Sequence, residues 1–204
     1  MKSSGEGKRW AKVRGLLLVT LITQLLLFVS LGVSIVAPRK RIWPPPSRHS
    51  WQFYSTWVGS YIALSGAFLL AVLDENSLRL ALIVRLGVGV PLFLSGAALI
   101  AWASRTLTVH ATLGLGGQLI RSGPYRWSRN PQYVGVCAYL ASLTILSGSL
   151  LTGVACGAIS LWFLTATFAE EPWLARQFGV EYEEYRRVVP RLLGWPKRAV
   201  SRIS

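Results

Sequence analysis

The sequence predicts an all-α, multi-pass transmembrane protein of about five spans, with a short amphipathic helical segment near the C-terminus. Of its 204 residues, 52% are hydrophobic and only 15% are charged, whereas an average soluble domain has about 25% charged residues. The apolar residues are gathered in long stretches, and most of the basic residues lie between them. Because one small core cannot bury this much apolar surface, part of it must face lipid, and residues 1–204 are expected to form a single membrane domain.

The first three apolar stretches are each long enough to cross a bilayer, which takes about 20 residues. Leu16–Ala37 has Gln24 as its only strongly polar member, and it is longer than the apolar region of a signal peptide, so a retained span is expected. Trp51–Leu73 opens with aromatic residues that suit a membrane interface. Leu78–Ala103 is the third stretch, and it contains a proline that should kink the helix.

The fourth apolar stretch, Tyr133–Phe168, is too long for one span. The small residues Ser147-Gly148-Ser149 near its middle favour a tight turn, and the first half can begin earlier, at Pro131. These features predict two spans that form a helical hairpin. A connector at Arg39–Ser50 contains three consecutive prolines and is expected to be stiff and extended.

The net charge of +14 is explained by membrane anchoring. The basic residues lie in the gaps between apolar stretches and no nucleic-acid-binding motif accompanies them, so nucleic acid is not expected as a partner. With five spans, 15 of the 22 Lys and Arg residues fall on the side of the C-terminus. The positive-inside rule then places the C-terminus and the active site in the cytoplasm, although the basic N-terminus argues for the opposite orientation.

Metal chemistry is not expected from this sequence. It has two cysteines, Cys137 and Cys156, and two histidines, His49 and His110, and they are not arranged with the spacing of a zinc site. Two cysteines inside apolar stretches also argue against a disulfide scaffold. Functional groups are instead concentrated in two polar segments.

The first polar segment, residues 118–133, joins a turn to a helix start. Ser122-Gly123-Pro124 reads as a turn, and Asn130 followed by Pro131 is typical of an N-cap and a first helical position. The free N–H groups of such a helix start suit a carboxylate or a phosphate. Caps, turns and interfacial arginines give the alternative, purely structural interpretation. The arginines nearby are Arg121, Arg126 and Arg129.

The second polar segment, residues 170–190, begins with two adjacent carboxylates at the end of an apolar stretch. Glu170 and Glu171 would hold a cation, or they would be first-turn acids of a new short helix opened by Pro172. Apolar and aromatic residues then recur at helical spacing, so they share one helix face that lies either on the membrane or back over the first segment. These residues are Leu174, Phe178, Tyr182, Tyr185 and Val189.

The motifs of both segments, in their order and spacing, resemble the isoprenylcysteine carboxyl methyltransferase and phospholipid N-methyltransferase superfamily of integral membrane methyltransferases. The resemblance covers residues 110–195, which are therefore expected to form the cofactor-binding and catalytic part: a loop, the helical hairpin and the C-terminal segment. The matching residues are Gly123-Pro124-Tyr125, Arg129-Asn130-Pro131-Gln132-Tyr133, Glu170-Glu171, Phe178-Gly179, Glu181-Tyr182, Tyr185 and Val189-Pro190.

This resemblance implies methyl transfer from S-adenosyl-L-methionine to a lipophilic or membrane-embedded acceptor, with the cofactor held at the cytosolic ends of the last spans. Arg129 is the predicted catalytic residue, and its guanidinium suits the cofactor's carboxylate. Two alternatives are an NADPH-dependent membrane reductase of the sterol reductase type and a non-catalytic lipid-binding relative. The predicted cofactor-binding residues are Gly117, Gln118, Leu119, Ile120, Tyr125, Asn130, Pro131, Gln132, Tyr133, Glu170 and Glu171.

Two positions depart from the prenylcysteine enzymes. Asn130 stands where they have a histidine, and Ala166 stands where they have an arginine that meets the substrate carboxylate. A buried carboxylate without a partner is costly. The expected acceptor is therefore a membrane-soluble amine, hydroxyl, thiol or phospholipid headgroup, and not a prenylcysteine carboxylate.

Overall fold

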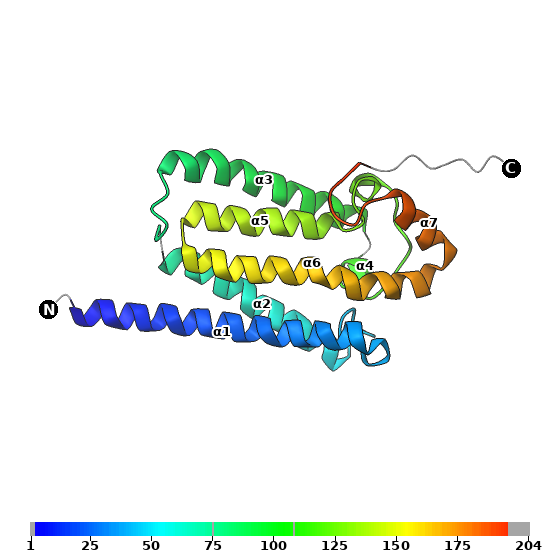
Figure 1. Ribbon diagram of the computed structural model, residues 1–204, viewed down its shortest axis with the longest axis horizontal. Coiled ribbons are helices and arrows are strands. Elements are labelled where there is room, and N and C mark those ends of the chain that lie inside the picture. Colours follow the sequence, from blue (N-terminus) through cyan, green and yellow to red (C-terminus); the bar gives the residue numbers. More distant parts are fainter. Residues whose placement is uncertain (1–2, 75, 108, 196–204) are drawn as a thin grey trace.

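The computed structural model describes residues 3–74, 76–107 and 109–195, and every regular element within these ranges is helical. Figure 1 shows the long helices side by side along one axis, with the shorter elements gathered at one end of the bundle. The long helices are α1 (Ser3–Val36), α2 (Trp51–Leu73), α3 (Leu82–Thr106), α5 (Pro131–Ser147) and α6 (Leu150–Phe178). The short elements are η1 (Pro38–Lys40), α4 (Val109–Thr112), η2 (Gly123–Arg126) and α7 (Val180–Val188).

The multi-pass architecture predicted from the sequence is confirmed. In the part of the chain that is described, four helices are long and apolar enough to cross a membrane: α1 from Glu6 onward, α2, α3 and α6. Helix α5 has 17 residues, about 25 Å at 1.5 Å per residue, which is at the lower end of the lengths that cross the hydrocarbon core. The predicted count of about five spans thus becomes four by length, with α5 as the short fifth helix of the bundle.

The predicted helical hairpin is present, and its turn has the expected residues. Helix α5 ends at Ser147, and Gly148 follows with φ = 62°, in the left-handed region that favours glycine. The hydroxyl of Ser149 then accepts a hydrogen bond of 2.9 Å from the N–H of Thr152 and caps α6. Ser149 also donates to Oδ2 of Asp74 at 2.7 Å, which ties the end of α2 to this turn.

Small residues allow α3 and α5 to pack closely. A Cβ added at Gly96 would lie 2.8 Å from the backbone nitrogen of Tyr139, and one added at Gly135 would lie 3.0 Å from the carbonyl oxygen of Gly96. Neither glycine can be replaced without moving backbone, as in other close helix contacts within membranes. Helix α1 packs on α2 and α6. Large apolar side chains such as Leu25 and Leu26 remain exposed on the outer face of α1, as expected for a surface that meets lipid.

The end of α6 excludes the alternative in which Pro172 opens a new short helix. Helix α6 continues through Pro172 to Phe178, and α7 follows after Gly179. A proline removes one hydrogen bond from a helix interior, and contacts around Glu170 and Glu171, described below, hold this part of α6 in place.

Helix α7 settles the choice left open for the apolar stripe, because it folds back over the first polar segment. Tyr182, Tyr185 and Val189 are buried together against Leu119. The Tyr185 hydroxyl donates to the carbonyl oxygen of Tyr125 at 2.8 Å. Both polar segments therefore meet at one end of the bundle.

Candidate active site

A cavity of about 350 Å³ lies at this end of the bundle, where α2, α5 and α6 meet the connector and the loop that precedes η2. Its size is within the range of small-molecule and cofactor sites. Ten of the twelve residues predicted as catalytic or cofactor-binding line it, and Pro131 and Glu171 do not. The ten are Gly117, Gln118, Leu119, Ile120, Tyr125, Arg129, Asn130, Gln132, Tyr133 and Glu170.

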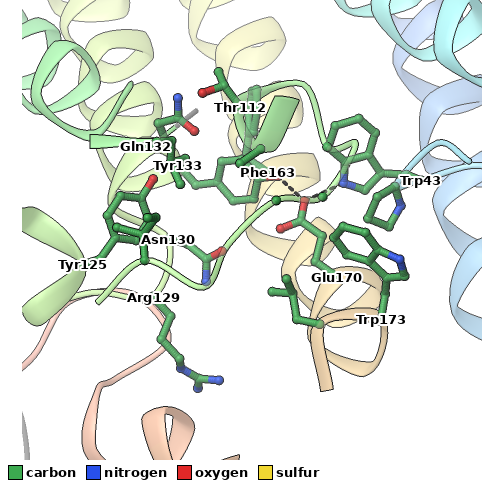
Figure 2. A pocket seen from close by; sticks show the side chains of 18 of the residues that line it. Trp43, Thr112, Tyr125, Arg129, Asn130, Gln132, Tyr133, Phe163, Glu170 and Trp173 are labelled. Atoms are coloured by element: carbon green, nitrogen blue, oxygen red, sulfur yellow. Dashed lines mark hydrogen bonds between the residues drawn. The ribbon is translucent and has the colours of Figure 1, made fainter. Parts of the chain in front are cut away.

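Glu170 presents one carboxyl oxygen to the cavity. The indole N–H of Trp43 donates to Oε1 at 2.6 Å, and the Tyr133 hydroxyl donates to the same oxygen in a short hydrogen bond. Both bonds are accepted by Oε1, and Figure 2 shows the second oxygen pointing to the side of the cavity where Asn130 lies. The partners of Glu170 are neutral, so its charge has no protein counter-ion in the described part of the chain, and a cation in the cavity would supply one.

Glu171 is turned to the other side of α6, where two arginines bind it. Arg191 donates to it through Nε at 2.8 Å and through Nη2 at 2.7 Å, a bidentate pair. Nη1 of Arg129 lies 2.7 Å from Oε1, and the side chains of Arg129 and Glu171 are only 9% and 6% exposed. The predicted cofactor role of Glu171 therefore has a physical obstacle, because its carboxylate is already used by the protein.

Arg129 lines the cavity, but its charge is compensated by this ion pair. The N–H of its backbone donates to the carbonyl oxygen of Pro190 at 2.9 Å, which ties the start of α5 to the chain after α7. The hydrogen bond to Glu171 also raises the pKa of Arg191. Arg129 therefore lines the cavity and also helps to hold the start of α5 to the chain after α7. The ion-paired cluster of Arg129, Glu171 and Arg191 is called the Glu171 clasp below.

Asn130 precedes α5, as predicted, but its side chain makes no capping hydrogen bond. Its Nδ2 donates instead to the carbonyl oxygen of Arg191 at 2.9 Å. Pro131 occupies the first helical position, as expected, and is buried away from the cavity. The N-terminus of α5 therefore borders the cavity, and the Asn130 side chain does not cap the N–H groups there.

The glycine-rich loop contributes backbone to the wall. Gly114 and Gly116 have φ of 76° and 88°, in the left-handed region. This backbone conformation favours glycine at both positions, and a Cβ added at Gly116 would also lie 2.9 Å from Nε2 of Gln177 on α6. Residues 117–120 continue along the cavity from this point.

Sequence reasoning missed the aromatic part of the wall, which comes mainly from α2, α6 and the connector. Trp43 was treated only as part of a stiff connector, yet it is buried and packs on Trp162 with ring centroids 5.6 Å apart. A tryptophan directly before three prolines is an unusual choice for a solvated linker, and this was the available signal. The other missed aromatic residues on the wall are Trp57, Trp162, Phe163 and Trp173.

The inner part of the cavity is apolar and carries polar groups without partners. Leu64, Val136 and Phe163 line it from three helices. Thr56 is only 2% exposed, and neither its hydroxyl nor the indole N–H of Trp57 makes a hydrogen bond within the described residues. Unpaired buried donors are costly, so a bound molecule with a hydrogen-bond-accepting atom would stabilise this part.

Ala166 does not line the cavity. It is completely buried against Leu27 and Leu31 of α1, together with Trp162. An arginine at this position would point into the α1–α6 contact in this structure. The identity of residue 166 therefore does not by itself decide which acceptor fits.

Two tyrosines of α7 add neutral polar atoms to the wall. Burial, aided by the negative charge of Glu171, raises the pKa of Tyr182 to about 12. Burial also raises the pKa of Tyr185 well above its usual value. Both phenols are therefore protonated near neutral pH. No group of three or more metal-ligating side chains lies together among the described residues.

The fold and the site agree with a match to a family model. Residues 84–181 match the model described as phospholipid methyltransferase. This match confirms the resemblance to membrane methyltransferases that the motifs predict.

Two known proteins are similar to part of this chain. The chain is 35% identical over 100 residues to methanethiol S-methyltransferase of Mycobacterium tuberculosis, an alignment that covers 48% of this chain and 37% of the relative. It is 36% identical over 74 residues to human protein-S-isoprenylcysteine O-methyltransferase, covering 35% of this chain and 26% of the relative. The chain thus matches little more than a third of the first relative's length and about a quarter of the second's. No solved structure matches it significantly.

Proposed function

We propose that the protein transfers a methyl group from S-adenosyl-L-methionine to a lipophilic or membrane-embedded acceptor. The observation that carries this proposal is the free carboxyl oxygen of Glu170 at the wall of a cofactor-sized cavity. The cofactor has a positively charged ammonium and a positively charged sulfonium, and a carboxylate among aromatic rings suits both charges. The family match supports the same reaction class.

The cofactor would occupy the polar end of the cavity. Glu170 would hold the ammonium group through Oε2, and Tyr133 would keep Oε1 in place. The start of α5 at Asn130 would face the cofactor's carboxylate, which the helix N-terminus favours. Backbone of residues 117–120 would contact the remainder of the molecule. The proposed site keeps the ten predicted residues that line the cavity and leaves out Pro131 and Glu171.

The acceptor would occupy the inner, apolar part of the cavity. Bound there, it would meet Leu64, Val136 and Phe163, with the Thr56 hydroxyl and the Trp57 N–H as hydrogen-bond donors. Arg129 is the one basic residue among the described lining residues, and Glu171 already compensates it. An uncharged amine, hydroxyl or thiol therefore fits better than a prenylcysteine carboxylate.

Methyl transfer needs little covalent help from the protein. The bound cofactor supplies an electrophilic methyl group, and the wall must hold the acceptor atom in line with it while excluding water. Arg129 serves this reaction by fixing the start of α5 next to the cofactor site. The absence of a histidine at position 130 is consistent with such a positioning role for the protein.

An NADPH-dependent reductase is the alternative from another enzyme class. NADPH carries several phosphate charges, and proteins bind such groups with free arginines or lysines. The cavity wall offers the carboxylate of Glu170 and an arginine that is already paired. This charge balance favours S-adenosyl-L-methionine, and a non-catalytic lipid-binding relative would require neither cofactor.

Binding measurements separate these three candidates. Purified protein in detergent would be titrated by calorimetry with S-adenosyl-L-methionine and, separately, with NADPH. We expect saturable binding of S-adenosyl-L-methionine alone. Binding of NADPH alone would favour the reductase, and binding of neither would favour the lipid-binding relative.

The acceptor class is tested by transfer of a radiolabelled methyl group in detergent. Extracted membrane lipids and a farnesylcysteine analogue would be offered separately. We expect label in the lipid fraction. Label in the farnesylcysteine alone would contradict the uncharged acceptor.

We propose a cytoplasmic C-terminus and active site on the basis of the distribution of Lys and Arg. Reporter fusions at the C-terminus and in the loop at residues 74–77 should report opposite sides, with the C-terminal reporter in the cytoplasm. A C-terminal reporter outside the cytoplasm would show that the basic N-terminus determines the orientation.

A further inference from the structure

The connector between α1 and α2 is fixed against the cavity, although it lies outside residues 84–181, which the family model matches. The hydroxyl oxygen of Ser34, near the end of α1, accepts hydrogen bonds of 2.9 Å from the N–H groups of Ile42 and Trp43. The guanidinium of Arg41 lies 5.5 Å from the ring centre of Trp173 on α6. The connector is thus anchored at both α1 and α6.

Trp43 fills a slot that the surrounding residues leave for it. Its side chain packs on Trp162, and the residue is only 6% exposed. A Cβ added at Gly114 would lie 3.0 Å from the Trp43 ring, so this loop also packs closely on it. The indole therefore has little freedom to turn, and the direction of its N–H group is set by packing.

That N–H group points to Glu170, and Figure 2 shows the hydrogen bond. An indole N–H only donates, so it stabilises the carboxylate and takes no proton from it. With the Tyr133 hydroxyl, it holds Oε1 from two directions. A carboxylate held at one oxygen presents the other oxygen in a fixed direction.

We propose that Trp43 is a positioning residue that orients Glu170 toward the ammonium group of S-adenosyl-L-methionine. The proposal rests on the proposed function, and it adds that the N-terminal part of the chain completes the cofactor site. Trp43 also lines the cavity, but in this role it acts on the ammonium group through Glu170.

A double-mutant cycle on the full-length protein tests this role. The dissociation constant for S-adenosyl-L-methionine would be measured in detergent for the wild type, Trp43→Phe, Glu170→Ala and the double variant. Trp43→Phe keeps an aromatic ring and removes the donor, so we expect affinity to fall about three- to tenfold. In the Glu170→Ala background the same change should have no further effect, because the group it orients is absent.

If Trp43 served only to pack the cavity wall, Trp43→Phe would change the dissociation constant in a different pattern across the two backgrounds. If Trp43→Phe weakens binding by the same factor in both backgrounds, or leaves the wild-type affinity unchanged, the proposal is wrong. Trp51→Phe, at a tryptophan that is 65% exposed at the start of α2, is the matched control and should leave the affinity unchanged. Absence of binding by the wild type itself would instead overturn the proposed function.

Folding is checked by thermal melting of each variant. If Trp43→Phe does not fold, the sulfur analogue β-(3-benzothienyl)alanine at position 43 keeps the size and shape of the indole and removes only the N–H donor. The same three- to tenfold loss, confined to the Glu170 background, is expected from it. An unchanged dissociation constant with this analogue would contradict the proposal.

Discussion

Glu170 and Glu171 are neighbours on the last turns of α6, yet their carboxylates have different partners. Glu171 is bound by two guanidinium groups, with Arg129 and Arg191 each 2.7 Å away. Glu170 has only neutral donors, both on one oxygen, and its other oxygen remains available at the cavity.

The comparison shows that one of two adjacent carboxylates can stabilise the fold while the other stays available to a ligand. A buried carboxylate with protein cations on both oxygens holds segments of the chain together, and here Glu171 joins the start of α5 to the chain after α7. A buried carboxylate held only by neutral donors has no protein counter-ion, so a cationic ligand can supply one. The predictions below test this division, beginning with the largest effect on stability.

Glu171→Gln should be strongly destabilising. It leaves the Arg129 guanidinium, which is only 9% exposed, without a counter-charge. Breaking a buried ion pair costs roughly 3–5 kcal/mol, so the melting temperature in detergent should fall clearly. A melting temperature equal to that of the wild type would show that the ion pairs of Glu171 do not stabilise the fold.

Arg191→Leu should have a smaller effect. The Arg191 side chain is 34% exposed and water screens its pair with Glu171, while Arg129 still compensates the carboxylate. We expect a loss of about 1–2 kcal/mol in urea denaturation, part of it from the lost contact with Phe168, whose ring lies 4.2 Å from the guanidinium. A loss as large as that of Glu171→Gln would show that Arg191, and not Arg129, is the main partner.

Tyr185→Phe tests a neutral hydrogen bond that also holds α7 in place, for comparison with the ion pairs of Glu171. It removes only the hydroxyl that donates to the carbonyl oxygen of Tyr125. A buried hydrogen bond between neutral groups contributes about 1 kcal/mol, so stability should fall by that amount. Tyr139→Phe is a control in the same residue type, and an equal loss there would indicate a general effect of losing a hydroxyl.

The pKa of Tyr182 predicts an effect that is absent near neutral pH and appears only at alkaline pH. The pKa is about 12 in the folded chain and 10.0 without these interactions. Between these values the unfolded chain loses the proton first, so the free energy of unfolding falls as pH rises from 10 to 12. Tyr182→Phe should make that fall less steep. An identical pH profile in both proteins would contradict the raised pKa.

Much of the fold was predictable because local residues determine it. Pro131 and the turn at Ser147-Gly148-Ser149 define the ends of α5 and the start of α6 where the sequence places them. The path of α6 through Pro172 was not predictable from local signals, because proline normally favours a helix start or break. Contacts with α7 and the Glu171 clasp override that preference.

The candidate site was predictable only within the polar segments. The order and spacing of the motifs predicted ten residues that line the cavity, but the sequence could not show that arginines would pair with Glu171 and not with Glu170. That separation depends on Arg191, which is 20 residues beyond Glu171. Trp43 lies 127 residues from Glu170 and in no matched motif, so only the three-dimensional structure connects them.

The central claim is that the Glu170 carboxylate binds the positively charged ammonium group of the cofactor. It is tested most directly by the dissociation constant of S-adenosyl-L-methionine for the wild type and Glu170→Gln, with melting temperatures measured on the same samples. Removing a charge-assisted hydrogen bond costs roughly 1.5–3 kcal/mol, so affinity should fall about tenfold or more while the melting temperature changes little. A folded Glu170→Gln protein that binds S-adenosyl-L-methionine as tightly as the wild type would contradict the account.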